Sequence, residues 1–70
     1  MADALIRVNG LSEPLAAATI GALLAEKAVD TAQRGIAVAL NGNVIPRSAW
    51  SQTSLQAGDL VEVLSAAQGG

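Results

Sequence analysis

The stretch IAVALNGNVIP, residues 36–46, decides the fold of this chain. Its first five residues are apolar and partly β-branched, which predicts a strand over Ile36–Leu40. Asn41-Gly42-Asn43 is typical of a tight turn between antiparallel strands, because Asn and Gly tolerate the positive φ angles of such turns. Val44-Ile45 is then a short partner strand, which Pro46 ends because proline has no backbone N–H to donate. The stretch predicts a β-hairpin in the middle of the chain.

Further strand signals lie at both ends of the chain. Residues 4–8 predict a strand, and Asn9-Gly10 after them is again a hairpin signal. A second, short strand is expected near residues 11–15, at a sheet edge, because it contains Glu13 and Pro14. Residues 56–59 predict a turn, and residues 60–64 predict the last strand, with alternate side chains on opposite faces.

A single helix is expected between the two hairpins. Thr19 is a candidate N-cap, because its hydroxyl can accept from an unpaired amide of the first turn. Ile20, Leu23, Leu24 and Ala28 follow at helical spacing and form one apolar stripe. The helix is expected to end near Ala28, with a polar connection over residues 29–35, and residues 48–50 predict one further helical turn.

The order hairpin, helix, hairpin, strand predicts an α+β domain in which one helix covers one face of a mixed sheet of four to five strands. We expect the last strand beside the first, a folded body over residues 1–64 and a flexible tail over residues 65–70. No second helix is predicted to cover the other face, which is part apolar and part charged, as docking surfaces are. That face is expected to carry Leu5, Arg7, Ala37, Ala39, Leu60, Glu62 and Leu64.

The composition excludes several classes of function. The 70 residues include no Cys, His or Tyr, so we expect no disulfide and no structural zinc site. The net charge is -2 and the four basic residues are scattered, so no face suited to nucleic acid is apparent. We find no signal peptide, and the longest apolar run is too short to span a bilayer, so a soluble cytoplasmic protein without a metal is expected.

The terminal Gly69-Gly70 is where we expect the chemistry, because few reactive side chains precede it. Glycine has no Cβ, so a diglycine end fits a channel too narrow for other residues. A carboxylate is a poor electrophile and must be activated, for example as an acyl-adenylate, before sulfur or nitrogen attacks it. The chain has no phosphate-binding loop, so we expect a partner enzyme to perform the activation. Gln68 belongs to the same tail.

Three other features have a structural interpretation that is favoured over a functional one. Gly58-Asp59 is expected to form a turn before the last strand. Trp50 is expected to pack against the core with its indole N–H at the rim. Arg47 is expected to be a solvated surface charge, with contact to an acidic partner as the alternative. No pair of carboxylates suggests acid–base catalysis.

In combination, these features resemble the ThiS-type sulfur carrier proteins of thiamine biosynthesis, which are ubiquitin-like and have the β-grasp fold. The resemblance rests on residues 37–47, Trp50, residues 55–63 and the terminal Gly69-Gly70. It implies a carrier that is not itself an enzyme and binds no cofactor of its own. An E1-like adenylating enzyme of the ThiF type would use ATP to adenylate Gly70, and a cysteine-derived persulfide would convert it into a thiocarboxylate.

The resemblance also implies partners and leaves alternatives open. The thiocarboxylate would deliver sulfur to a thiazole synthase of the ThiG type, with a donor such as a cysteine desulfurase supplying the sulfur. A MoaD-type carrier for molybdopterin synthesis ends in the same way, although Pro46-Arg47 and Trp50 favour the thiamine type. A ubiquitin-like modifier of lysines and a binding module with an accidental diglycine end are the remaining alternatives.

Overall fold

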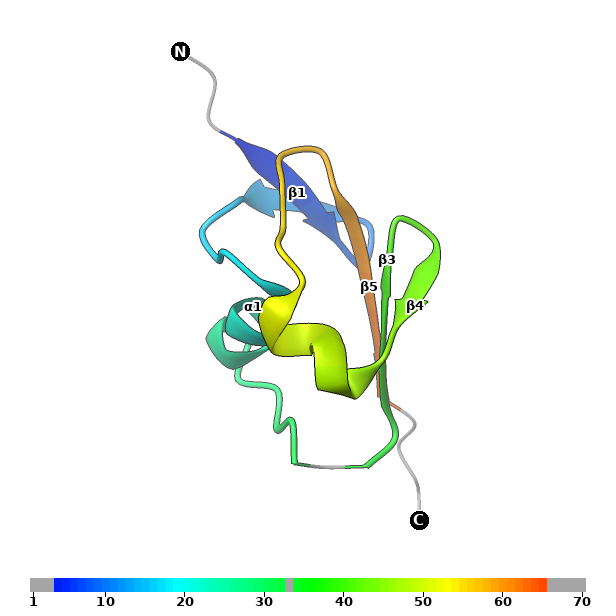
Figure 1. Cartoon of the computed structure of the whole chain (residues 1–70). Helices are drawn as coiled ribbons and strands as arrows, with labels where there is room; N and C mark the ends of the chain where they lie inside the picture. Colours follow the sequence, from blue (N-terminus) through cyan, green and yellow to red (C-terminus); the bar gives the residue numbers. More distant parts are fainter. Residues whose placement is uncertain (1–3, 33, 66–70) are drawn as a thin grey trace.

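The computed structural model describes residues 4–32 and 34–65, which form a five-stranded sheet with the strand order β2-β1-β5-β3-β4. One α-helix, α1, lies against one face of this sheet (Figure 1). The predicted fold class, an α+β domain with a mixed sheet on one helix, is therefore confirmed. The elements are β1 (Leu5–Val8), β2 (Leu11–Pro14), α1 (Ile20–Glu26), β3 (Ile36–Leu40), β4 (Asn43–Ile45), the 3-10 helix η1 (Arg47–Gln52) and β5 (Leu60–Ser65).

Both predicted hairpins are present and use the same turn. β1 pairs with β2 and β3 pairs with β4, each pair antiparallel and joined by an Asn-Gly loop. Asn9 and Asn41 both have φ 52°, and Gly10 and Gly42 have φ 85° and 86°. Positive φ at both loop positions defines the type I′ turn, which matches the twist of the flanking strands. β2 and β4 are the two sheet edges, as Pro14 predicts for β2.

β5 is the central strand. It runs parallel to β1 on one side and antiparallel to β3 on the other, so the last strand lies beside the first as expected (Figure 1). The pairing with β1 covers only Leu60 and Val61, whereas the pairing with β3 continues to Ser65. Ser65, which we assigned to the tail, therefore belongs to β5.

The helix begins where the sequence predicts and ends earlier. The Thr19 hydroxyl accepts a hydrogen bond from the Ala22 N–H at 3.1 Å, which confirms Thr19 as the N-cap. The expected end near Ala28 is wrong, because α1 ends at Glu26. Ala28 is exposed and has φ 60°, a left-handed conformation that stops a helix. The apolar spacing of residues 20–28 did not reveal this conformation.

The core lies between α1 and the covered face of the sheet. Ile20, Leu23 and Leu24 of α1 are 0–1% exposed and pack against sheet residues that are equally buried. No polar or charged side chain of the described residues is buried. The buried set is Ile6, Val8, Ala17, Ile20, Leu23, Leu24, Val38, Trp50, Leu55 and Val61.

The 3-10 helix η1 packs against α1 and is longer than the single turn expected at residues 48–50. Gly21 of α1 permits this contact. A Cβ at Gly21 would lie 3.3 Å from the Ser51 Cα, which is tighter than backbone normally allows. Glycine slightly destabilises a helix, but at this position it lets α1 and η1 approach more closely.

Candidate functional site

The face of the sheet that α1 does not cover is the candidate functional surface, and we call it the open face. Because side chains alternate along a strand, β5 directs Val61 toward α1 and its neighbours Leu60 and Glu62 away from it. Leu60 is 49% exposed and Val61 is 1% exposed. The seven residues predicted for this face all come from β1, β3 and β5, and all are exposed except the half-buried Ala39. Their role in docking stays a prediction.

The sequence analysis missed members of the open face on both edge strands, β2 and β4. Val44 lies opposite Ala39 in the β3–β4 pair and is 75% exposed. Ser12 lies opposite Arg7 in the β1–β2 pair. Directly opposed residues of an antiparallel pair share a face, so counting outward from each two-residue Asn-Gly loop would have found both. The open face therefore extends over all five strands.

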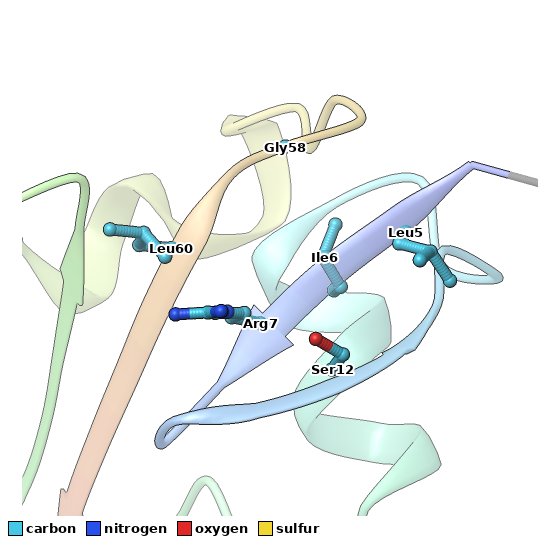
Figure 2. A pocket seen from close by; sticks show the side chains of 6 residues that line it. All are labelled: Leu5, Ile6, Arg7, Ser12, Gly58 and Leu60. Carbon is cyan, nitrogen blue, oxygen red and sulfur yellow. The ribbon is translucent and has the colours of Figure 1, made fainter.

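Two hollows indent the open face, and each has a volume of about 360 Å³. Arg7 and Leu60 line both of them. In Figure 2, the Arg7 side chain extends from β1 toward β5, close to Leu60, and Ser12 approaches from β2. The first hollow is lined by Leu5, Ile6, Arg7, Ser12, Gly58 and Leu60, and the second by Arg7, Gly10, Gly42, Leu60, Val61 and Glu62.

Two asparagines hold β5 in the middle of the sheet. The Asn9 N–H donates to the Val61 carbonyl at 2.9 Å, and its side-chain oxygen accepts from the Val63 N–H at 2.8 Å. Asn41 makes an equivalent pair of bonds at the start of the strand. Its N–H donates to the Leu60 carbonyl at 2.8 Å, and its side-chain oxygen accepts from the Leu60 N–H at 2.9 Å. We interpreted both residues as hairpin chemistry alone, so this second role was missed.

The turn before β5 is structural, as predicted. Gly58 has φ 88°, and the Asp59 carboxylate accepts from the Gln56 N–H at 2.8 Å. Its other oxygen accepts from the Asn41 side-chain amide at 3.1 Å. Asp59 thus connects this turn to the β3–β4 turn, and both turns fix the start of β5.

Trp50 and Arg47 lie on the other side of the sheet, with α1. Trp50 is 5% exposed and its indole N–H donates to the Ile45 carbonyl at 2.9 Å, so it is a packing residue, as expected. The Arg47 guanidinium lies 4.7 Å from the centre of the Trp50 ring and donates to the Thr31 carbonyl. Arg47 is exposed, as predicted, and these contacts also fix its position.

The residues expected to carry the chemistry follow β5 directly. Gln68, Gly69 and Gly70 lie outside the described residues, so the predictions for the tail stay predictions. Residues 4–32 and 34–65 contain no group of three or more metal-ligating side chains. In the same part of the chain, no helix has the length and hydropathy needed to cross a membrane.

Comparison with known proteins identifies relatives. The sequence profile of the ThiS family matches residues 4–70. The crystal structure of a thiamine biosynthesis protein (ThiS) from Geobacter metallireducens superposes with a TM-score of 0.75 at 33% sequence identity. The match covers 94% of this chain and 99% of that one. The search of curated proteins finds no match.

Proposed function

The chain belongs to the ThiS family of sulfur carrier proteins, and on that basis we propose that it carries sulfur for thiamine biosynthesis as a thiocarboxylate on Gly70. The observation that carries this proposal is the extent of the family match, which spans the folded body and continues through Gly70. A carrier of this kind is a substrate of other enzymes and not an enzyme itself.

The chemistry follows from the reactivity of a carboxylate. A carboxylate oxygen of Gly70 attacks the α-phosphorus of ATP in the active site of an E1-like (ThiF-type) enzyme, which releases pyrophosphate and leaves an acyl-adenylate. The terminal sulfur of a cysteine persulfide, supplied by a donor such as a cysteine desulfurase, then displaces AMP. A second thiol then attacks the donor cysteine sulfur and forms a disulfide with it, which breaks the acyl sulfur–sulfur bond and releases the thiocarboxylate. ATP is bound by the activating enzyme and not by this chain.

The folded body is the part of the chain that the partner enzymes bind during these reactions. The open face presents Leu5, Leu60 and Leu64, which are 49%, 49% and 69% exposed. Exposed apolar side chains grouped on one face mark interaction surfaces, so we propose that this face docks on the activating enzyme and on the ThiG-type thiazole synthase. β5 joins this face to the tail, because it contains Leu60 and Leu64 and ends at Ser65.

The proposal is tested by intact mass spectrometry. The protein is incubated with a ThiF-type enzyme, ATP, cysteine and a cysteine desulfurase, and we expect replacement of one oxygen by sulfur on the last residue. The matched control lacks Gly70 and retains the whole folded body, and we expect it to stay unmodified.

Two outcomes would contradict the proposal. An unchanged mass, under conditions in which another ThiS protein is converted, would show that this chain is not a sulfur carrier of this type. An isopeptide bond to a lysine of another protein, without a thiocarboxylate, would identify a protein modifier instead.

A further inference from the structure

We propose that Arg7 is the charged anchor of the open face and binds a carboxylate side chain of the activating enzyme. The inference rests on the proposed function, since it requires that this face docks on that enzyme. It adds the chemistry of the partner surface, which is an acidic side chain surrounded by apolar groups.

The position of Arg7 is the first argument. Arg7 lies opposite Ser12 of β2 and beside Leu60 of β5, and it lines both hollows of the open face. The half-exposed Leu5 and Leu60 border the same hollow (Figure 2). A partner that covers these two leucines therefore also covers the guanidinium.

The second argument is that Arg7 has no internal partner. Its side chain makes no hydrogen bond and no ion pair with any other residue in the described part of the chain. Lys27 differs, because it pairs with Glu13 at 2.6 Å, and so does Arg47, which stacks on Trp50.

Docking changes the surroundings of this charge. Removing water from an unpaired guanidinium is costly, and apolar contacts alone do not offset that cost. A carboxylate does offset it, because its two oxygens accept a parallel pair of N–H donors from arginine. We therefore expect a partner that covers Leu5 and Leu60 tightly to place a carboxylate over Arg7.

The neighbouring charge favours a single acidic group over a polyanion. Glu62 lines the second hollow together with Arg7, and the net charge of the chain is -2. A nucleic acid or an anionic membrane would bring many negative charges toward Glu62 as well as toward Arg7. One carboxylate placed over Arg7 brings much less of that repulsion.

The test is the steady-state kinetics of pyrophosphate release by the ThiF-type enzyme with this protein as the varied substrate. We expect Arg7→Gln to raise the KM for the carrier about tenfold or more, since truncating one partner of a covered charge pair strongly weakens binding. The kcat should stay unchanged, because the tail is intact. Arg7→Lys keeps the charge without the paired donors, so its KM should lie between those of the wild type and Arg7→Gln.

Arg34→Gln is the matched control, because it makes the same change in net charge at an exposed residue outside the open face. We expect its KM to stay within about twofold of the wild-type value. Equal KM values for Arg7→Gln and Arg34→Gln would overturn the inference and leave the proposed function standing. Absence of pyrophosphate release with the wild-type protein would instead overturn the proposed function. Thermal unfolding of each variant verifies that the fold is intact.

Discussion

The two faces of the sheet are built from similar residues and differ in their exposure to solvent. On β5, Val61 is 1% exposed, whereas Leu60 and Leu64 of the same strand are 49% and 69% exposed. The difference lies in what covers them, because α1 packs on one face and none of the described elements packs on the other. Hydrophobicity alone therefore does not identify the core of this protein. The covered face stabilises the fold, and the open face leaves apolar surface exposed.

The two faces also differ in charge. Among the described residues, the one ion pair, between Glu13 and Lys27, lies at the edge of the covered side, where β2 and the end of α1 meet. Arg7 and Glu62 stand on the open face without such a pair. The covered side therefore carries one charge pair within the chain, and the open face carries charges with no such pair among the described residues.

The largest expected effect separates the two faces by their contribution to stability. Leu24 is 0% exposed, so Leu24→Ala should lower the free energy of unfolding by about 2–5 kcal/mol through lost burial and a cavity. Leu64→Ala removes the same atoms from the open face and should change it by less than about 0.5 kcal/mol. Urea denaturation followed by the fluorescence of Trp50, the single tryptophan, measures both values.

The proposed difference in stability between the two faces would be contradicted if Leu64→Ala were as destabilising as Leu24→Ala. Such a result would mean that the open face is buried in solution, most simply by self-association. Repeating the denaturation over a range of protein concentrations separates that case, because the stability of an associated form depends on concentration.

The next effect concerns the strand that both faces share. Asn41→Ala removes the hydrogen bonds to the Leu60 N–H and the Asp59 carboxylate, and it places alanine, which tolerates positive φ less well than asparagine, at φ 52°. We expect a loss of about 1–3 kcal/mol in the free energy of unfolding, again measured in urea. Asn41→Gly keeps the turn relaxed and lacks only the side-chain bonds, so it should cost less than Asn41→Ala.

Equal stabilities for the wild type and Asn41→Ala would show that the side chain does not hold β5. A large loss in Asn41→Ala with none in Asn41→Gly would attribute the whole effect to the backbone conformation of the turn. Either result would reduce Asn41 to the hairpin role that the sequence analysis assigned to it.

The features that the sequence predicts well are those set by local chemistry. The two Asn-Gly turns, the Thr19 cap and the edge position of Pro14 each follow from what one or two residues do to the backbone. The alternation of β5 was predicted for the same reason, and with it the exposure of Leu60, Glu62 and Leu64. These elements restrict the topology so strongly that the fold class follows from them.

The features that escaped prediction either run against residue propensity or depend on neighbours distant in sequence. The left-handed Ala28 ends α1 early, although alanine is the best helix former, so no propensity indicates the stop. Asn9 contacts Val63, and Asn41 contacts Leu60, only because β5 inserts between the two hairpins. Val44 was missed because its face is set by pairing register and not by its own short strand.

The smallest expected effect concerns the ion pair at the edge of the covered side. The Glu13 carboxylate lies 2.6 Å from the Lys27 amine, and the side chains are 21% and 38% exposed. Because solvent and salt screen such a pair, Glu13→Gln should lower the free energy of unfolding by no more than about 1 kcal/mol at low ionic strength and by less at high salt. Glu62→Gln is the matched control on the open face and should change it less, since Glu62 has no ion-pair partner in the described part of the chain. Urea titrations of both variants at two salt concentrations measure the difference.

Equal and salt-independent changes in the two variants would mean that pairing within the chain does not distinguish the charges of the two faces. In that case the absence of a partner for Arg7 and Glu62 would no longer indicate a docking surface.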